Sequence, residues 1–298
     1  MPKGDILSVG VRTDVELLRV ISAFGIVCFH SGYGFARDAA YAGLVVFLVF
    51  SIYFALNSTK KYSVRSRALR LLVPCLIWSI IYAFTDVLRG DPVFSGGSSI
   101  LSKVLLTPAV HLWYLPFVFF WLIALDRVKS VNPQVLAVAA ASSACILLMT
   151  APFWRQWEYS SPFGQYMHAT PAVLLGVFLA LYSYCSSLQK RILLVGVIAC
   201  IGVILMLNIS GISLTYGLGF CASLILLKNR DMLPSNRVIL VFSKLTFGIY
   251  LVHPLIIDVM RYLGVSDFLL PVLTFFASAM FIYLMLKVIP KSVSQYLA

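Results

Sequence analysis

Charged residues are scarce in this 298-residue chain. Asp, Glu, Lys and Arg make up 11% of it, whereas hydrophobic residues make up 61%. Soluble domains carry about 25% charged residues, so the composition excludes an ordinary soluble protein and predicts one that crosses a membrane several times. Acidic residues are fewer than basic ones, 11 against 23, and the net charge is +12. In a soluble protein that charge would indicate nucleic acid; in a membrane protein we expect lipid headgroups as partners and no nucleic acid.

Other features are also missing. The six cysteines lie in apolar segments and show neither zinc-ligand spacing nor a CxxC pair, so we interpret them as small buried hydrophobes and expect no disulfide and no metal. The first sixteen residues lack an apolar region with a small-residue cleavage site, so we expect no cleavable signal. The loops are short and no internal repeat is present, which predicts one domain over residues 1–298.

Long apolar segments are abundant. A membrane-spanning helix needs about 20 apolar residues, and we assign ten spans, several of them shorter than this: Leu17–Phe35, Ala39–Leu56, Leu71–Leu88, Val110–Leu125, Val135–Met149, Ala169–Tyr184, Ile192–Ile209, Ile212–Leu227, Val238–Met260 and Phe268–Val288. The weakest break is at Gly211, between the seventh and eighth spans. The predicted fold class is therefore all-α, a polytopic bundle of about ten transmembrane helices.

Basic residues are divided unevenly between the two sides of these spans. With the N-terminus in the cytoplasm, sixteen Lys and Arg residues fall in cytoplasmic segments, and five fall on the other side: Arg37, Arg89, Lys103, Arg155 and Arg261. Because cytoplasmic loops carry an excess of Lys and Arg, we expect both termini to be cytoplasmic.

The first span contains two ionisable residues, Arg19 and His30. Such residues inside a membrane are costly unless paired or facing a cavity, so they indicate a functional site. Eleven residues of helix rise about 16 Å and complete about three turns, so both side chains point to the same interior. Glu16 lies three residues before Arg19, and we expect an ion pair that lowers the cost of burying the guanidinium. A structural Arg and an unrelated His are the alternative interpretation.

The predicted orientation places all four histidines in the outer half of the protein. His111 begins the fourth span, His168 precedes the sixth, and His253 lies far along the ninth. The first two also suit the membrane interface. His253 precedes Pro254, which leaves a backbone carbonyl free, so a structural hydrogen bond is an alternative role.

A basic run precedes the third span, on the inner side. It holds Lys61, Arg65, Arg67 and Arg70 and no acidic residue. Such a run enforces topology or contacts anionic lipid. The alternative is a polyphosphate ligand, because Arg67 and Arg70 share a helix face and guanidinium groups suit phosphate oxygens.

Four segments together resemble the acyltransferase-3 family of integral membrane acyltransferases. They are Glu16-Leu17-Leu18-Arg19 followed after ten residues by His30; Arg67-Ala68-Leu69-Arg70 ahead of Pro74; His111-Leu112-Trp113-Tyr114-Leu115; and Ser243 with Phe247-Gly248-Ile249-Tyr250-Leu251-Val252-His253-Pro254. They occur in the family's order and cover nearly the whole chain. The resemblance implies transfer of an acyl group, usually acetyl, from cytoplasmic coenzyme A to a hydroxyl of a carbohydrate or lipid-linked glycan.

On this basis we expect acetyl-CoA as donor, with catalysis by His30, Arg19 and Glu16 and donor binding by Arg67, Arg70, Arg65 and Lys61. His30 would act as general base or carry the acyl group covalently. Arg19 would contact the donor or anchor Glu16. The expected substrate-binding residues are His111, Trp113, Tyr250, His253 and Glu158; for Trp113 and Tyr250, ordinary packing is an equal alternative.

A transporter or flippase-like subunit of glycan export is the second functional hypothesis. The absence of a repeat between the two halves of the chain argues against it. The expected location is a bacterial inner membrane. The acceptor sugar, the acyl chain and the oligomeric state do not follow from the sequence.

Overall fold

A computed structural model describes residues 12–32, 37–60, 62–93, 109–128, 130–157, 159, 161–229 and 233–290. Within these ranges every regular element is a helix: α1 (Thr13–His30), α2 (Arg37–Ala40), α3 (Ala42–Asn57), α4 (Val64–Arg89), η2 (Val110–Trp113), α6 (Tyr114–Val128), α7 (Pro133–Met149), α8 (Ala151–Trp154), α9 (Phe163–Leu181), η3 (Tyr182–Tyr184), α10 (Ser187–Leu207), α11 (Ser213–Lys228), α12 (Arg237–Tyr262) and α13 (Leu270–Val288). The all-α prediction is confirmed.

Each predicted span overlaps one helix, or a long helix extended by a short one; the end of the first predicted span, residues 33–35, lies outside the described residues. Among the described residues, seven such helices are long and apolar enough to cross a membrane: α2 with α3, α4, η2 with α6, α9 with η3, α10, α12 and α13. The apolar helices α7 and α11 are shorter, and α1 carries Asp14, Glu16 and Arg19. Ten crossings and cytoplasmic termini therefore stay predictions.

Several helices begin earlier than hydropathy predicts. The third span was expected from Leu71, but α4 begins at Val64, where the Ser63 side chain accepts a hydrogen bond from the Ser66 backbone N–H at 3.1 Å. Such a cap satisfies one of the free N–H groups of the first turn. Arg65, Arg67 and Arg70 of the basic run therefore lie in the helix. The length of the apolar segment does not predict this, because the cap is a polar feature that precedes it.

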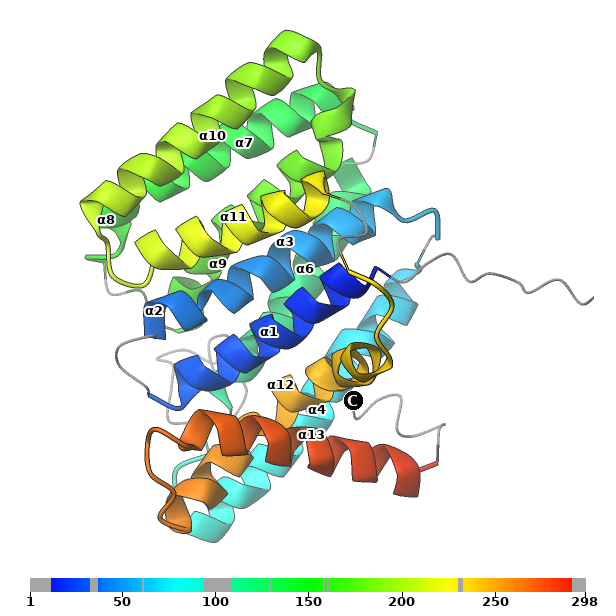
Figure 1. The fold of residues 1–298 in the computed structure, drawn as a ribbon, viewed down its shortest axis with the longest axis vertical. Coiled ribbons are helices and arrows are strands. Elements are labelled where there is room, and N and C mark those ends of the chain that lie inside the picture. The colour runs from blue at the N-terminus through cyan, green and yellow to red at the C-terminus, as the bar shows by residue number, and fades with distance from the viewer. Residues whose placement is uncertain are drawn as a thin grey trace, which may run out of the picture.

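The bundle is built around α3. This helix packs against α1, α9 and α11; α7 lies on the far side of α9, and α10 beyond α7. On the other flank α12 packs against α1 and α13. Figure 1 shows α7 and α10 along one edge of the molecule, and α13 crossing the opposite edge. The first helix therefore lies between the two flanks of the bundle.

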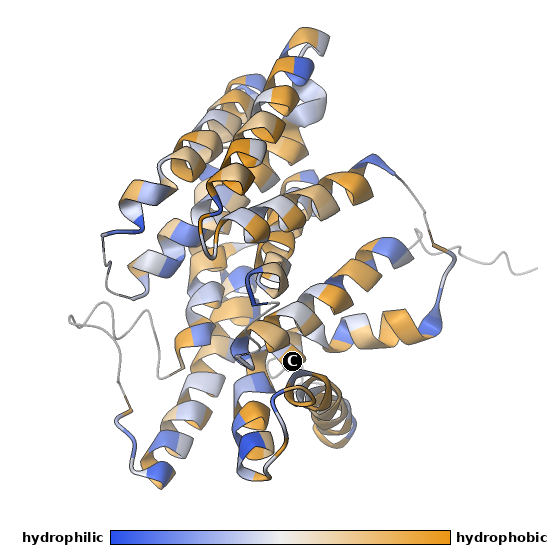
Figure 2. Ribbon diagram, turned by 60° about the vertical axis from the view of Figure 1, so that its left-hand side comes forward, coloured by the Kyte–Doolittle hydropathy of each residue, from blue (hydrophilic) through white to orange (hydrophobic). Residues whose placement is uncertain are grey.

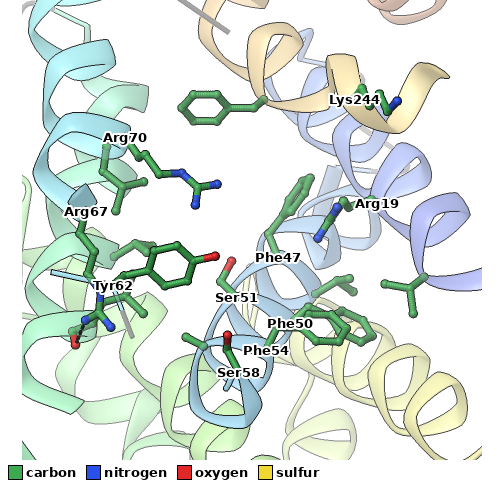
Figure 3. A pocket seen from close by; sticks show the side chains of 17 residues that line it. Arg19, Phe47, Phe50, Ser51, Phe54, Ser58, Tyr62, Arg67, Arg70 and Lys244 are labelled. Atoms are coloured by element: carbon green, nitrogen blue, oxygen red, sulfur yellow. Dashed lines mark hydrogen bonds between the residues drawn. The ribbon is translucent and has the colours of Figure 1, made fainter. Parts of the chain in front are cut away.

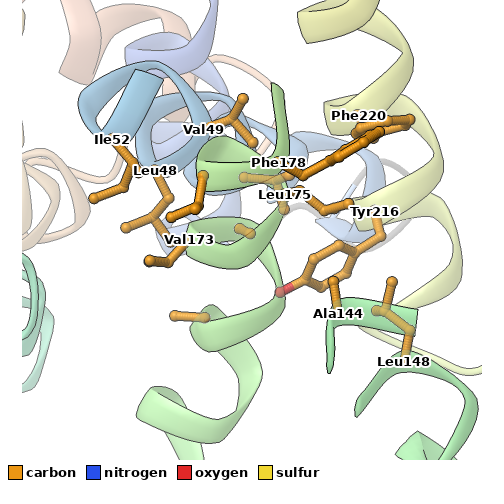
Figure 4. Packing of buried hydrophobic residues seen from close by; sticks show 14 of the residues in the cluster. Leu48, Val49, Ile52, Ala144, Leu148, Val173, Leu175, Phe178, Tyr216 and Phe220 are labelled. Carbon is orange, nitrogen blue, oxygen red and sulfur yellow. The ribbon is translucent and has the colours of Figure 1, made fainter. Parts of the chain in front are cut away.

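The buried apolar residues form two main clusters on either side of this centre. The larger one joins α3, α7, α9 and α11, with the fully buried side chains of Leu48, Phe178, Tyr216 and Phe220 among its members, as Figure 4 shows. The second joins α1, α4, α12 and α13. Because lipid tails are as apolar as these side chains, close packing rather than transfer from water holds such helices together.

Two glycines allow the neighbours of α3 to approach it closely. A Cβ atom at Gly176 of α9 would lie 2.9 Å from the Val49 carbonyl oxygen, and one at Gly219 of α11 would lie 2.6 Å from the Val45 Cβ. Small residues at these contacts bring helix backbones together, as is common in membranes.

The outer faces of the bundle are apolar. On α4, the side chains of Leu76, Ile80 and Phe84 succeed one another at four-residue intervals, each 62% exposed. Figure 2 shows hydrophobic residues along most of the helices, and hydrophilic ones mainly near their ends. This pattern is that of a multi-pass membrane protein whose apolar sides face lipid.

Candidate active site

Glu16 and Arg19 form the ion pair that their spacing predicts. The Arg19 Nη1 lies 3.1 Å from the Glu16 Oε2 and 3.2 Å from its Oε1. Oε2 also accepts a hydrogen bond from the Ser243 hydroxyl of α12. Glu16 therefore holds the start of α1 against α12 and fixes the position of the Arg19 side chain, which is 42% exposed.

Arg67 is buried and paired. Its Nη1 lies 2.6 Å from the Asp126 Oδ2 and donates a hydrogen bond to the Leu122 carbonyl oxygen, both on α6. These contacts join the start of α4 to α6. Arg67 was expected to bind the donor. Its partner Asp126 could not be predicted, because nothing in the sequence shows that residues 67 and 126 meet.

Arg70 is exposed, one turn further along α4. Its guanidinium carbon lies 5.7 Å from the centre of the Tyr62 ring. Across the described residues, no carboxylate lies within salt-bridge distance of Arg70. A stacked guanidinium that keeps its charge is suited to an anionic ligand.

Arg19, Arg67, Arg70 and Lys244 all line one cavity of about 670 Å³. Figure 3 shows the two arginines of α4 on one side of it, and Arg19 and Lys244 on the other. The remaining wall is mostly apolar and includes Phe47, Phe50 and Phe54 of α3, together with the hydroxyl groups of Ser51, Ser58 and Tyr62. No Asp or Glu is among the described residues that line it. We call it the cationic cavity.

Of the four basic residues that line the cationic cavity, Lys244 is the one that the sequence motifs did not assign to a site. It is an exposed basic side chain in α12, one residue after Ser243. Its position inside an apolar span was a usable signal, of the kind that identified Arg19.

Three histidines meet at the other end of α1. The ring centroids of His30 and His253 are 5.0 Å apart, those of His111 and His253 are 5.5 Å apart, and those of His30 and His111 are 6.3 Å apart. His111 and His253 are buried, whereas His30 is exposed. We call these residues the histidine cluster. No group of three or more His, Cys, Asp or Glu side chains in the described part of the chain is placed to hold a metal ion.

The orientation of His253 is set by the helix that carries it. Its Nδ1 lies 2.8 Å from the Tyr250 carbonyl oxygen and 3.2 Å from that of Ile249. Pro254 lacks an N–H group and so leaves the Tyr250 carbonyl without its helical partner. Because a carbonyl only accepts, Nδ1 carries the proton, and Nε2 presents a lone pair. Nε2 is buried, with no hydrogen-bond partner among the described residues.

A line of contacts joins the cationic cavity to the histidine cluster. The Ser51 hydroxyl lies 3.5 Å from the Tyr114 hydroxyl, the rings of Tyr114 and Tyr250 are 5.6 Å apart, and those of Tyr250 and His111 are 5.7 Å apart. The Tyr250 hydroxyl donates to the His111 carbonyl oxygen. Tyr250 thus lies between the cationic cavity and the histidine cluster.

The other expected site residues lie elsewhere. Trp113 is buried against Phe117 and Tyr166, and Arg65 is exposed; neither lines the cationic cavity. The fourth histidine, His168, was not among the expected site residues; it lies on α9, outside the histidine cluster, with its Nε2 2.7 Å from the Gly211 carbonyl oxygen. Lys61 and Glu158 lie outside the described residues.

The model of the acyltransferase-3 family, described as an acyltransferase domain, matches residues 12–288. The chain belongs to the acyltransferase-3 family. The match includes every residue of the cationic cavity and of the histidine cluster. No curated protein and no solved structure matched the chain. This protein is thus a multi-pass membrane acyltransferase, and its fold places a cationic cavity and a histidine cluster at the two ends of one helix.

Proposed function

We propose that this acyltransferase moves an acyl group, acetyl in the simplest case, from acyl-coenzyme A on the cytoplasmic side to a hydroxyl of a cell-surface or lipid-linked carbohydrate. The membrane would be a bacterial inner membrane. One observation carries the proposal: four cationic side chains line a single cavity, and the His30 imidazole lies about 16 Å further along α1, the helix that supplies Arg19.

The cationic cavity suits the charged end of coenzyme A. Arg70 and Lys244 offer charge without a carboxylate partner within the described residues, and Arg19 adds a partly exposed guanidinium. Hydrogen bonds from such groups to phosphate oxygens are among the strong ones in proteins. Arg67 is held by Asp126, so in this proposal it positions the start of α4 and adds charge at the cavity wall.

The pantetheine arm would follow the contacts from Ser51 past Tyr114 and Tyr250 to the histidine cluster. This direction carries the thioester towards His30. The apolar wall of the cavity formed by Phe47 and Phe50 suits the uncharged arm better than the phosphates.

His30 is the group we assign as general base. It is exposed, whereas its two histidine neighbours are buried, so an acceptor hydroxyl has access to it. The imidazole takes the hydroxyl proton as the oxygen attacks the thioester carbonyl. The carbon–sulfur bond breaks, the ester forms, and the thiolate of coenzyme A leaves and is protonated.

Isotope transfer tests this function. The protein in lipid nanodiscs receives acetyl-CoA labelled in the acetyl group, together with lipid-linked oligosaccharide from a bacterial membrane extract. We expect label in the saccharide and free coenzyme A in equal amount. Passage of saccharide across proteoliposomes without label transfer would instead favour the transporter. An acyl-imidazole trapped on His30 by acid quenching would replace the general-base mechanism with a covalent one.

A further inference from the structure

A second cavity, of about 790 Å³, lies where α1, α2, α8, α9 and α11 come together. Its walls differ from those of the cationic cavity. Aromatic side chains are numerous, and the polar groups comprise a carboxylate, an amide, an imidazole and two guanidinium groups. We call it the aromatic cavity. Its volume is in the range of sites that hold small ligands.

The aromatic groups offer flat faces. Phe29 and Tyr41 are stacked, with ring centroids 4.0 Å apart and planes 21° apart, and form one side of the cavity. Trp157 is 64% exposed and lies 6.0 Å from the ring of Tyr159. An exposed indole also suits the membrane interface, but the interface alone does not explain the polar groups beside it.

The polar groups supply both donors and acceptors. The Asp38 Oδ2 accepts from the Gly211 backbone N–H at 2.7 Å, which fixes the carboxylate at the wall. The Arg155 Nη1 donates to the Ser210 carbonyl oxygen at 2.5 Å, and the Gln165 Nε2 donates to the Ser161 hydroxyl at 2.9 Å. The Oε1 of Gln165 is buried and has no partner among the described residues. The Ser210 hydroxyl also donates to the Asp38 Oδ2, at 3.4 Å. These contacts hold the three side chains in place, and each side chain has further donor or acceptor atoms.

The aromatic cavity lies next to the proposed base. Phe29, which lines it, directly precedes His30, and the two ring centroids are 5.2 Å apart. Tyr41 connects the cavity to His168, with rings 5.2 Å apart. Arg19, on the cationic cavity, is eleven residues from His30 on the same helix. His30 itself does not line the aromatic cavity, so the ring of Phe29 is what connects a ligand there with His30.

We propose that the aromatic cavity binds a pyranose ring of the acyl acceptor, with one face of the sugar on Trp157 and its hydroxyls held by Asp38 and Arg155. A sugar needs an aromatic face together with donors and acceptors. An acyl chain needs none of these polar groups. A polyphosphate fits the cationic cavity, which has no carboxylate among its described lining residues, better than a cavity that includes Asp38. This inference rests on the proposed function, since it is the acceptor of that reaction that the cavity holds.

Direct sugar binding tests the inference without relying on catalysis. The probes are the methyl pyranosides of glucose, galactose, mannose and N-acetylglucosamine, observed by saturation-transfer-difference NMR with the protein in nanodiscs. At least one should bind saturably. Trp157→Ala should weaken that binding roughly tenfold, the size expected for one lost stacking contact, and Trp157→Phe should restore most of it. Phe153→Ala is the matched control, because Phe153 is 66% exposed in the same segment but does not line the cavity.

The outcomes separate this inference from the proposed function. If no pyranoside binds, or if Phe153→Ala weakens binding as much as Trp157→Ala does, the aromatic cavity is not the acceptor site and its indole belongs to the membrane interface. If sugar binding depends on Trp157 but acetyl-CoA transfers no label, the site stands and the donor assignment fails. Label transfer with an unchanged acceptor KM in Trp157→Ala would retain the function and overturn the site.

Discussion

His30 of α1 and His253 of α12 have ring centroids 5.0 Å apart, although 223 residues separate them in the chain. The proton of His253 is on Nδ1, which donates to the Tyr250 carbonyl oxygen, so its Nε2 presents a lone pair. The pair combines an exposed imidazole with a buried one of fixed tautomer. This arrangement gives the two residues different roles, which substitutions can separate.

His30→Ala should lower acyl transfer by about 10²- to 10⁴-fold, the range for loss of a general base. His30 is exposed, so the protein should still insert and purify normally. Initial rates with labelled acetyl-CoA measure the loss, and size-exclusion chromatography checks the fold. Tyr262→Ala is the control, since that ring is 92% exposed at the end of α12 and lines neither cavity. Near wild-type activity in His30→Ala would remove His30 from the mechanism.

His253→Asn and His253→Ala should differ. An Asn amide can still donate to the Tyr250 carbonyl that Pro254 leaves free, so we expect thermal stability close to wild type and kcat lowered about tenfold or more, with KM values unchanged. His253→Ala leaves that carbonyl unpaired and should also lower the unfolding temperature. An equal kcat in the Asn variant and in the wild type would show that His253 only stabilises its helix, through the hydrogen bond to the Tyr250 carbonyl oxygen.

Arg70→Ala should raise the KM for acetyl-CoA by about 10- to 100-fold, the equivalent of one charge-assisted hydrogen bond. Stability should change little, because the side chain is exposed. Arg65→Ala is the matched control, because it removes one positive charge from the first turns of the same helix, α4, at a residue that does not line the cationic cavity. The same increase in KM for both variants would mean that the basic run acts through topology or lipid.

Lys244→Ala should raise the KM for acetyl-CoA roughly three- to tenfold, with a smaller effect at high salt. A single ammonium group at an open cavity contributes less than a bidentate guanidinium and is screened over about 10 Å at 0.1 M salt. Titration of acetyl-CoA at low and high ionic strength measures this. Arg237→Ala, which removes an exposed charge at the start of the same helix, should leave KM unchanged. An unaffected KM in Lys244→Ala would exclude Lys244 from donor binding.

Gly176→Ala should destabilise the bundle by about 1–3 kcal/mol. The new Cβ would lie 2.9 Å from the Val49 carbonyl oxygen and would push α9 away from α3. Thermal unfolding in nanodiscs measures the effect. Gly202→Ala on α10 is the control, because nothing lies within 4 Å of its Cβ position. Equal unfolding temperatures for the two variants would contradict the close approach.

Much of the fold could be predicted because its signals are local. The lengths of the apolar segments were enough to predict the ten long helices of the described residues, α1, α3, α4, α6, α7 and α9 to α13. The three-residue spacing of Glu16 and Arg19 was enough to predict their ion pair. Helix starts were less accurate where a polar first turn is stabilised by capping, as at Ser63. The helical period also predicted that Arg19 and His30 share one side of α1. The structure places Arg19 at the cationic cavity and His30 in the histidine cluster.

The site was less predictable because it depends on contacts between distant segments. The pairing of Arg67 with Asp126, the meeting of His30 with His253, and the position of Lys244 in the cavity each join helices far apart in sequence. Hydropathy does not report which helices are neighbours. Trp113, for which ordinary packing was at least as strong an interpretation as sugar binding, packs against Phe117 in the larger apolar cluster.

Because α1 is continuous, one helix sets the distance between Arg19 in the cationic cavity and His30 in the histidine cluster. Arg19 and His30 are carried by the same uninterrupted run of backbone hydrogen bonds. Adding or deleting a single residue between them would swing the imidazole by about 100° around the helix axis and shift it by about 1.5 Å. The number of residues between Arg19 and His30, which is ten, therefore sets both the distance and the angle between the two side chains.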